Sequence, residues 1–369
     1  MAGELFLTIE FIGYVGARHF SEIHPAHGPV VDLDHIEAVA RAHEDGGFDR
    51  VLVAFHSTSP ESILISAHVA SITRRLGLMV AHRPGFTAPT LAARQFATLD
   101  QITRGRAAVH IITGGDDAEQ RQDGDFLGKD ERYARTDEYL EVVRKVWESD
   151  EPFDHHGRYY RFERAFSAVK CLQQPHIPVY FGGASDAAVA VAGRHADTYA
   201  LWGETHAQAR ELTSRVRAAA AAHGRSIRFS LSLRPILADT EEKAWARADD
   251  ILERARAVAD KTGFARKKPP VNAGSLRLLE AAAQGTRLDK RLWTALAALT
   301  GAKGSSTALV GTPEQVADAL LDYYDLGITT FLIRGFDPLE DALAYGHELI
   351  PLTRRLLAER ARSAGTAAA

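Results

Sequence analysis

The sequence contains a single cysteine, Cys171, among 369 residues, so it cannot form an internal disulfide bond. One cysteine fits a reducing compartment, and we therefore expect a cytoplasmic protein. No apolar run approaches the roughly 20 residues that a membrane-spanning helix needs. The first ten residues, MAGELFLTIE, lack the basic start and apolar core of a secretory signal. We expect no association with membranes.

An excess of positive charge is also absent, because 44 lysines and arginines face 48 aspartates and glutamates, for a formal net charge of −4. This balance gives no reason to expect a nucleic-acid surface. With 46% hydrophobic and 25% charged residues, the composition is that of an ordinary globular protein. The length allows two ordinary domains or one large α/β barrel.

Short β-branched or aromatic runs alternate with longer Ala-rich stretches along most of the chain. The runs that predict strands are 5–10, 50–54, 77–81, 107–112, 179–181, 198–201, 229–237 and 330–334. The stretches that predict helices are 34–45, 89–102, 131–148, 186–195, 206–223 and 313–326. Eight strands with helical crossovers predict an α/β fold, a (β/α)8 TIM barrel, as one domain over 1–360. We expect residues 361–369 to form a disordered tail.

Three regions interrupt this alternation. Residues 13–32 follow the first predicted strand and hold three histidines, and 151–178 have the pattern of a hairpin. Residues 239–306 form a long insertion after the seventh predicted strand. Because the loops after strands build the active site of a barrel, we expect this insertion to contain a mobile lid.

Two glycine pairs follow predicted strands. Gly182, Gly183, Ala184 and Ser185 end one strand and precede a helix, where backbone amides and the helix dipole favour a phosphate. A plain strand–helix turn capped by Ser185 is the structural alternative. The phenol of Tyr133 is a second candidate for phosphate contact, or else an ordinary core residue.

The other pair, Gly114 and Gly115, is followed by two aspartates that would repel a phosphate. These glycines instead suit the approach of a flat ring system, with polar contacts from His110 and Thr113. An acidic helix cap is the alternative interpretation.

Metal and hydrolase chemistry are disfavoured. Metal-dependent barrels place His-x-His at the end of the first strand, where this sequence reads IEFIG, and His155–His156 has no acidic partners at ligand spacing. We therefore expect no metal. A Gly-x-Ser-x-Gly nucleophile motif is absent as well.

Together these stretches resemble the bacterial luciferase-like flavin monooxygenases, and most closely the reduced-FMN-dependent alkanesulfonate monooxygenases. The matching sequence motifs occur in the same order along the barrel as far as about residue 350. They are 82–84 (HRP), 87–95 (TAPTLAARQ), 97–100 (ATLD), 113–114 (TG), 131–133 (ERY), 180–186 (YFGGASD), 202–204 (WGE), 223–229 (HGRSIRF) and 307–311 (TALVG).

The resemblance implies that Gly182–Ser185 and Tyr133 hold the FMN phosphate and that Thr113 and Gly114 lie by the isoalloxazine ring. It implies a separate NAD(P)H-dependent flavin reductase that supplies reduced FMN, O2 as cosubstrate, and a homodimer or homotetramer. In the sulfonate enzymes a carbon–sulfur bond of a small anionic substrate is cleaved to an aldehyde and sulfite.

The flavin half matches the sulfonate enzymes better than the substrate half does. Ser59 stands where they carry a cysteine, Ser232 where they carry an arginine, and Phe336 where they carry a tyrosine, whereas Trp202 is retained. Arg234, Lys303 and Arg334 remain candidates for binding an anionic substrate group. Their alternative role is ordinary ion pairing.

Because Phe336 removes a phenolic proton donor, His56 and His82 are candidates for proton transfer, beside Arg234 as a catalytic cation. Two rival functions stay open. One is a luciferase-like oxidoreductase that uses the deazaflavin F420, and the other is a flavin-binding protein without catalysis.

Overall fold

The computed structural model describes residues 8–262, 270, 272–302 and 304–367. Eight strands close into a parallel barrel, as predicted. In barrel order they are β1 (Glu10–Tyr14), β2 (Arg50–Val53), β3 (Gly77–His82), β4 (Ala107–Ile111), β7 (Val179–Gly182), β8 (Thr198–Trp202), β9 (Arg228–Leu237) and β13 (Thr330–Ile333). The chain divides into two compact units, one built from 51–200 and 214–227 and the other from the rest.

The unit built from 51–200 and 214–227 carries the regular alternation of strands and helices. Its helices are α2 (Ser62–Ile72), α3 (Pro89–Thr103), α4 (Asp117–Gln122), α5 (Lys129–Glu148) and α6 (Asp186–His195). Strands β3 and β4 pair in parallel, and so do β4 and β7, which places His110 opposite Tyr180. All six residues of β3 are buried, as expected for a strand covered on both faces. The predicted hairpin is present as β5 (Phe153–His156) and β6 (Arg161–Ala165).

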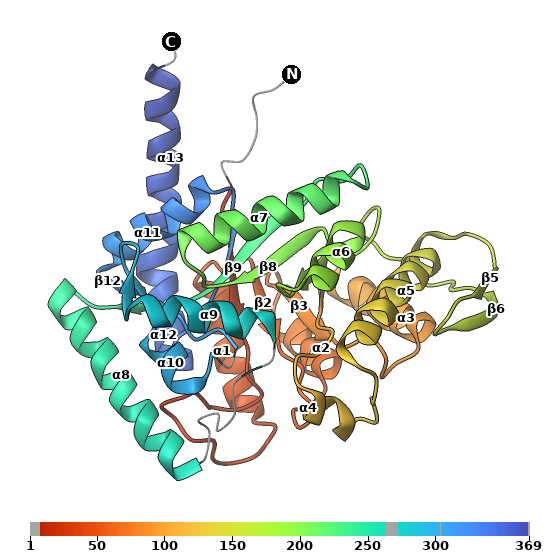
Figure 1. Ribbon diagram of the computed structural model, residues 1–369, viewed down its shortest axis with the longest axis horizontal. Helices are drawn as coiled ribbons and strands as arrows, with labels where there is room; N and C mark the ends of the chain where they lie inside the picture. Colours follow the sequence, from red (N-terminus) through yellow and green to blue (C-terminus); the bar gives the residue numbers. More distant parts are fainter. Residues whose placement is uncertain (1–7, 263–269, 271, 303, 368–369) are drawn as a thin grey trace. The chain divides into compact units, whose positions relative to one another are not determined.

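The other unit holds β1, β9 and β13, which pair in parallel as β1–β13–β9. Its helices are α1 (Leu33–Asp45), α8 (Glu241–Thr262), α9 (Ala273–Gln284), α10 (Ala295–Thr300), α11 (Pro313–Asp325), α12 (Pro338–Ala344) and α13 (Ile350–Ala367) (Figure 1). The π-helical turn η1 (Tyr345–Leu349) precedes α13. Helix α7 (His206–Ala221) has residues in both units. Thr312 caps α11 with its hydroxyl and Gln315 reciprocates, so the predicted start at Pro313 is confirmed.

The insertion at 239–306 contains helices rather than a structureless loop. It comprises α8, α9 and α10 and the short strands β10 (Arg287–Leu288) and β11 (Leu292–Trp293). Strand β11 pairs antiparallel with β12 (Ala308–Gly311), a strand that the sequence pattern did not predict, and β12 pairs with β9. The insertion is thereby joined to the sheet by hydrogen bonds. Its mobility as a lid stays a prediction.

Two boundaries differ from the prediction. The first strand begins at Glu10 rather than at residue 5, and residues 5–7 lie outside the described residues. Helix α13 continues to Ala367, through most of the tail that we expected to be disordered, because alanine and arginine favour helix strongly. Among the described residues, no helix is both long and apolar enough to cross a membrane.

Candidate functional site

The Gly182–Ser185 turn joins β7 to α6, as the sequence predicted. Ser185 is the N-cap of α6, and its hydroxyl accepts a hydrogen bond from the Ala188 amide at 3.3 Å. Gly183 has a backbone φ of +134°, a value that residues with a side chain rarely adopt. Its carbonyl accepts a hydrogen bond from the Tyr199 hydroxyl. Asp186 is the first residue of α6, and its carboxylate forms an ion pair with Arg215, with 2.6 Å between Asp186 Oδ1 and Arg215 Nη2. The turn is therefore a helix N-terminus with little uncompensated negative charge.

Tyr133 of α5 lies against this turn. A Cβ atom placed on Gly183 would be only 2.9 Å from the Tyr133 hydroxyl and 2.9 Å from the Ala188 Cβ. Burial raises the pKa of Tyr133, and a hydrogen bond with the Ser185 side chain offsets part of that rise. Near neutral pH the phenol is therefore a protonated donor. The hydroxyls of Tyr133 and Ser185 therefore lie together with Gly183 at the start of α6.

Gly183→Ala should reduce the free energy of unfolding by about 1–3 kcal/mol, because the new Cβ is strained at this φ and crowds Tyr133 and Ala188. Urea denaturation measures the loss. Gly224→Ala is the matched control, since Gly224 has φ +66° and no atom within 4 Å of the point that an added Cβ would occupy, so that variant carries backbone strain alone. Equal losses in the two variants would show that the turn is not tightly packed.

The Thr113–Gly114 strand end is shaped mainly by helix α4. The Gln120 side chain occupies the space where a Cβ on Gly114 would lie, at φ +96°, so glycine is required there by packing. Asp116 caps α4 by accepting from the amides of Ala118 and Glu119, as the acidic-cap alternative anticipated. The Thr113 hydroxyl lies 3.4 Å from that of Thr136. The proximity of Thr113 and Gly114 to a flavin ring stays a prediction.

Two side chains near these strand ends have buried polar atoms without hydrogen-bond partners among the described residues. His110 Nδ1 has no hydrogen-bond partner among the described residues, and burial lowers the pKa of His110 to about 4, so the ring is neutral near pH 7. Gln120 is 0% exposed, and neither atom of its amide group has a partner within the described part of the chain. Buried polar groups are rarely left unpaired in native proteins, which makes both side chains candidates for contact with a ligand or a bound water.

The two histidines proposed for proton transfer have very different surroundings. His82 is buried, its Nε2 lies 2.6 Å from the Tyr139 hydroxyl, and burial lowers its pKa to about 4. The side chain of His56 is 62% exposed and lies 3.4 Å from Glu119. Burial raises the pKa of Glu119, but hydrogen bonds from His56 and the charge of Arg83 outweigh it and lower the pKa to about 2. Ser59 is exposed beside His56, and its amide donates to the His56 carbonyl.

An open cleft of about 490 Å³ lies in the same unit. It is lined by loops that follow β3 and β4, by Arg135 of α5 and by two hairpin tyrosines; the lining residues are Gly85, Phe86, Asp123, Gly124, Asp125, Phe126, Leu127, Arg135, Tyr159 and Tyr160. None of the residues predicted to hold the cofactor is among them. The charge of Arg135 is neutralised by Asp125, with 2.5 Å between Arg135 Nη2 and Asp125 Oδ2.

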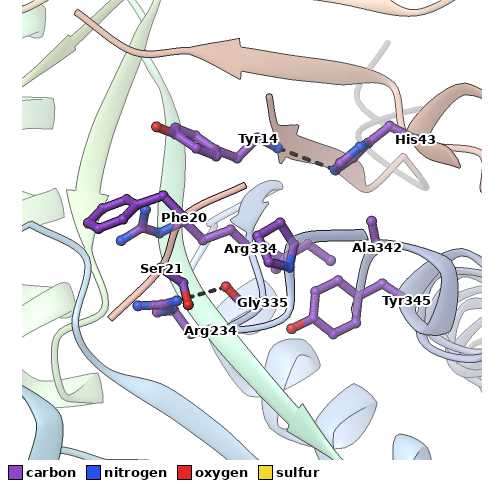
Figure 2. Close-up of a pocket in the computed structure, with 11 residues that line it drawn as sticks. Tyr14, Phe20, Ser21, His43, Arg234, Arg334, Gly335, Ala342 and Tyr345 are labelled. Atoms are coloured by element: carbon purple, nitrogen blue, oxygen red, sulfur yellow. Dashed lines mark hydrogen bonds between the residues drawn. The ribbon is translucent and has the colours of Figure 1, made fainter. Parts of the chain in front are cut away.

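The predicted substrate residues Arg234, Arg334 and Phe336 come together in the other unit. Arg234 is 1% exposed, and its Cζ lies 3.6 Å from the centroid of the Phe336 ring. Its Nη2 donates to the Gly335 carbonyl at 2.7 Å (Figure 2). Arg234 Nη1 lies 2.6 Å from Glu22 Oε2, and Arg334 Nη2 lies 3.2 Å from Glu22 Oε1. The two cations therefore share one carboxylate.

Two further substrate candidates, Trp202 and Ser232, have other contacts. Trp202 packs beside Gly274 and the buried residues of α9 and α10. The Ser232 carbonyl accepts from the Ser305 hydroxyl at 3.3 Å. Lys303 lies outside the described residues. The roles of Trp202 and Ser232 in binding substrate stay predictions.

The sequence patterns did not indicate Glu22, Gln120 or Arg83 as site residues. Glu22 lies in the loop after β1, where its neighbours Ser21, Ile23 and His24 form no recognisable motif. Its importance depends on partners that are 312 residues away in the case of Arg334. Within the described ranges, no group of three or more His, Cys, Asp or Glu side chains could hold a metal ion.

A family model for luciferase-like monooxygenases matches residues 9–330 of this chain. EDTA monooxygenase from Chelativorans sp. BNC1 has a similar structure, with 21% identity, a TM-score of 0.76, and 94% of each chain covered. So does the oxygenating constituent of 3,6-diketocamphane monooxygenase of Pseudomonas putida, solved with FMN: 17% identity, a TM-score of 0.68, and coverage of 93% of this chain and 96% of that one. An F420-dependent secondary alcohol dehydrogenase matches at 18% identity and a TM-score of 0.68, over 94% and 99% of the two chains. At these identities the similar structures show the fold alone.

Proposed function

Because the chain belongs to the luciferase-like monooxygenase family, we propose that it is a two-component flavin monooxygenase that uses reduced FMN and O2 to oxygenate a small organic substrate. The observation that carries this proposal is the meeting of Tyr133, Gly183 and Ser185 at the N-terminus of α6. A helix N-terminus with two hydroxyl donors beside it suits a phosphate monoester. FMN ends in such a group.

The residues present fit FMN. Glycine at position 183 lets the backbone of the turn pack directly against Tyr133 and Ala188, and Tyr133 and Ser185 would hold the phosphate. His110 Nδ1 is a buried atom without a partner in the described part of the chain, and it would meet a polar edge of the ring system. When bound, reduced FMN supplies two electrons, so that one atom of O2 enters the substrate and the other leaves as water.

The protein's part in this chemistry is to bind, orient and exclude water. The neutral ring of His110 can hold one hydrogen bond without adding charge near the flavin. His82 is buried with its ring nitrogen against the Tyr139 hydroxyl, whereas the His56 side chain is exposed to solvent beside Glu119. We therefore favour His56 over His82 for proton transfer.

The proposal includes partners. A separate NAD(P)H-dependent flavin reductase would deliver reduced FMN, and the enzyme would work as a homodimer or homotetramer in the cytoplasm. The single cysteine, Cys171, supports the location, because it requires no oxidising compartment. Light scattering of the purified protein measures the oligomeric state directly.

An alkanesulfonate, cleaved to an aldehyde and sulfite, is the narrower candidate for the substrate. It requires a cation that is open to an anion. Arg234 and Arg334 would supply it, but both contact Glu22 in this structure. Binding of an alkanesulfonate therefore depends on whether Glu22 leaves these two arginines open to another anion.

Oxygen uptake tests the proposed activity. With a flavin reductase, NADH and FMN present, adding the protein and a small-organic-compound library should reveal at least one compound that is oxygenated in step with O2 consumption. Oxygenated product measured by mass spectrometry with ¹⁸O2 should carry one labelled atom.

The F420 alternative makes a different prediction. An F420-dependent oxidoreductase would bind F420 much more tightly than FMN and would need no O2. Tight F420 binding together with anaerobic turnover would reject the monooxygenase proposal. A protein that binds FMN but shows no product with any reductase would support the flavin-binding protein without catalysis.

A further inference from the structure

Glu22 makes two ion pairs in a nearly closed environment. It is 8% exposed, and its two carboxylate oxygens face different cations, Oε2 towards Arg234 and Oε1 towards Arg334. Burial alone raises the pKa of Glu22, but the charges of the two arginines outweigh it and lower the pKa to about 2. Glu22 is therefore a carboxylate throughout the physiological range.

The backbone holds Glu22 in this position. Ser21 and His24 exchange backbone hydrogen bonds on either side of it, at 3.0 and 3.3 Å. Ile23 is buried in a core cluster that includes Phe336, and His24 Nε2 lies 2.6 Å from Asp337. The carboxylate is thus anchored on both flanks rather than carried by a free loop.

Little room remains for another anion. The cavity lined by Arg234, Arg334, Tyr14 and Tyr345 has a volume of about 20 Å³, enough for roughly one water molecule (Figure 2). Arg234 uses Nη2 for Gly335 and Nη1 for Glu22, and its face lies on Phe336. Only its Nε has neither an ion pair nor a hydrogen bond among the described residues, and one water would satisfy that atom. A sulfonate group is larger than the one water molecule that this cavity can hold.

We propose that Glu22 is a built-in anion that fills the position where Arg234 and Arg334 would otherwise hold an anionic substrate group, so that the substrate is uncharged at that end. That a substrate binds here rests on the proposed function, but the filling of the site is a property of the protein alone. Glu22 then determines specificity by excluding alkanesulfonates, since a second anion would need both space and an unpaired cation.

Rescue by small anions tests the proposal without flavin or O2. Glu22→Ala removes the carboxylate and opens its space, so formate should bind between the two arginines. We expect thermal unfolding of this variant to shift upward by roughly 2–4 °C in sodium formate relative to sodium chloride of equal ionic strength. The wild type and the double variant Glu22→Ala/Arg234→Met should shift by less than about 1 °C, because one lacks the space and the other the cation.

A formate shift in Glu22→Ala that disappears in the double variant would establish the filled site. Its absence, or an equal shift in the wild type, would overturn the proposal. If Glu22→Ala does not fold, calorimetric titration of the wild type with methanesulfonate decides instead. No binding is expected; binding that Arg334→Met abolishes would show that the arginine pair is open. Because these measurements contain no flavin, their failure is distinct from a failure to consume O2.

Discussion

Arg234→Met should reduce the free energy of unfolding by about 3–5 kcal/mol, which is the usual cost of removing one partner from a buried ion pair. The loss arises because Glu22 would keep a buried charge with only Arg334 left to meet it. Arg234 also donates to the Gly335 carbonyl, which would lose that donor. Urea denaturation, with the m-value compared between variants, measures the change.

The double variant Glu22→Leu/Arg234→Met should recover most of that stability. Replacing a buried ion pair with apolar side chains is often neutral, and here Phe336 and Ile23 offer apolar neighbours. Arg334 also loses Glu22 in this variant, but its side chain is 27% exposed and its charge can be solvated by water. Arg41→Met is the matched control, since Arg41 pairs with Glu37 on an exposed face of α1 and should cost less than about 1 kcal/mol. A double variant no more stable than Arg234→Met would mean that the loss comes from packing and not from the unpaired carboxylate.

The fold was predictable where the sequence contains strong local signals. Helix α6 occupies 186–195 as predicted because Ser185 caps it, and α11 starts at Pro313 after a capping box. The first strand was misplaced because 5–10 and 10–14 are both apolar and β-branched, and periodicity cannot choose between neighbouring runs. Strand β12 was missed because its four residues, Ala308–Gly311, give too short a pattern.

The candidate site divides in the same way. Gly182, Gly183 and Ser185 were found because a strand, a tight turn and a helix cap follow one another directly in the chain. Tyr133 was joined to them by family resemblance, and the structure brings it to the Gly183 turn. The Glu22–Arg334 contact joins residues 312 positions apart, so no local pattern could reveal it. Arg234 and Arg334 were recognised as cations from the sequence. Whether a ligand can contact them depends on neighbours that only the folded structure brings close.

Tyr133→Phe/Ser185→Ala should weaken FMN binding by about 100-fold or more while changing riboflavin binding by less than about 3-fold. Each lost hydrogen bond to a charged phosphate is worth roughly 1.5–3 kcal/mol, and two together correspond to at least two decades in Kd. Riboflavin lacks the phosphate and does not use these hydroxyls. Quenching of flavin fluorescence on titration of the flavin-free protein measures both constants.

The control must separate the phosphate contact from the loss of a helix cap. Ser185 caps α6, so its replacement costs about 1 kcal/mol of stability whether or not it touches FMN. Thr312→Ala removes the equivalent cap of α11 and should leave the affinity for FMN unchanged. If Tyr133→Phe/Ser185→Ala weakened riboflavin as much as FMN, the two hydroxyls would serve the fold of the turn and the phosphate would bind elsewhere. A selective loss of FMN would place the phosphate at the start of α6, which is the geometry that the glycine pair permits.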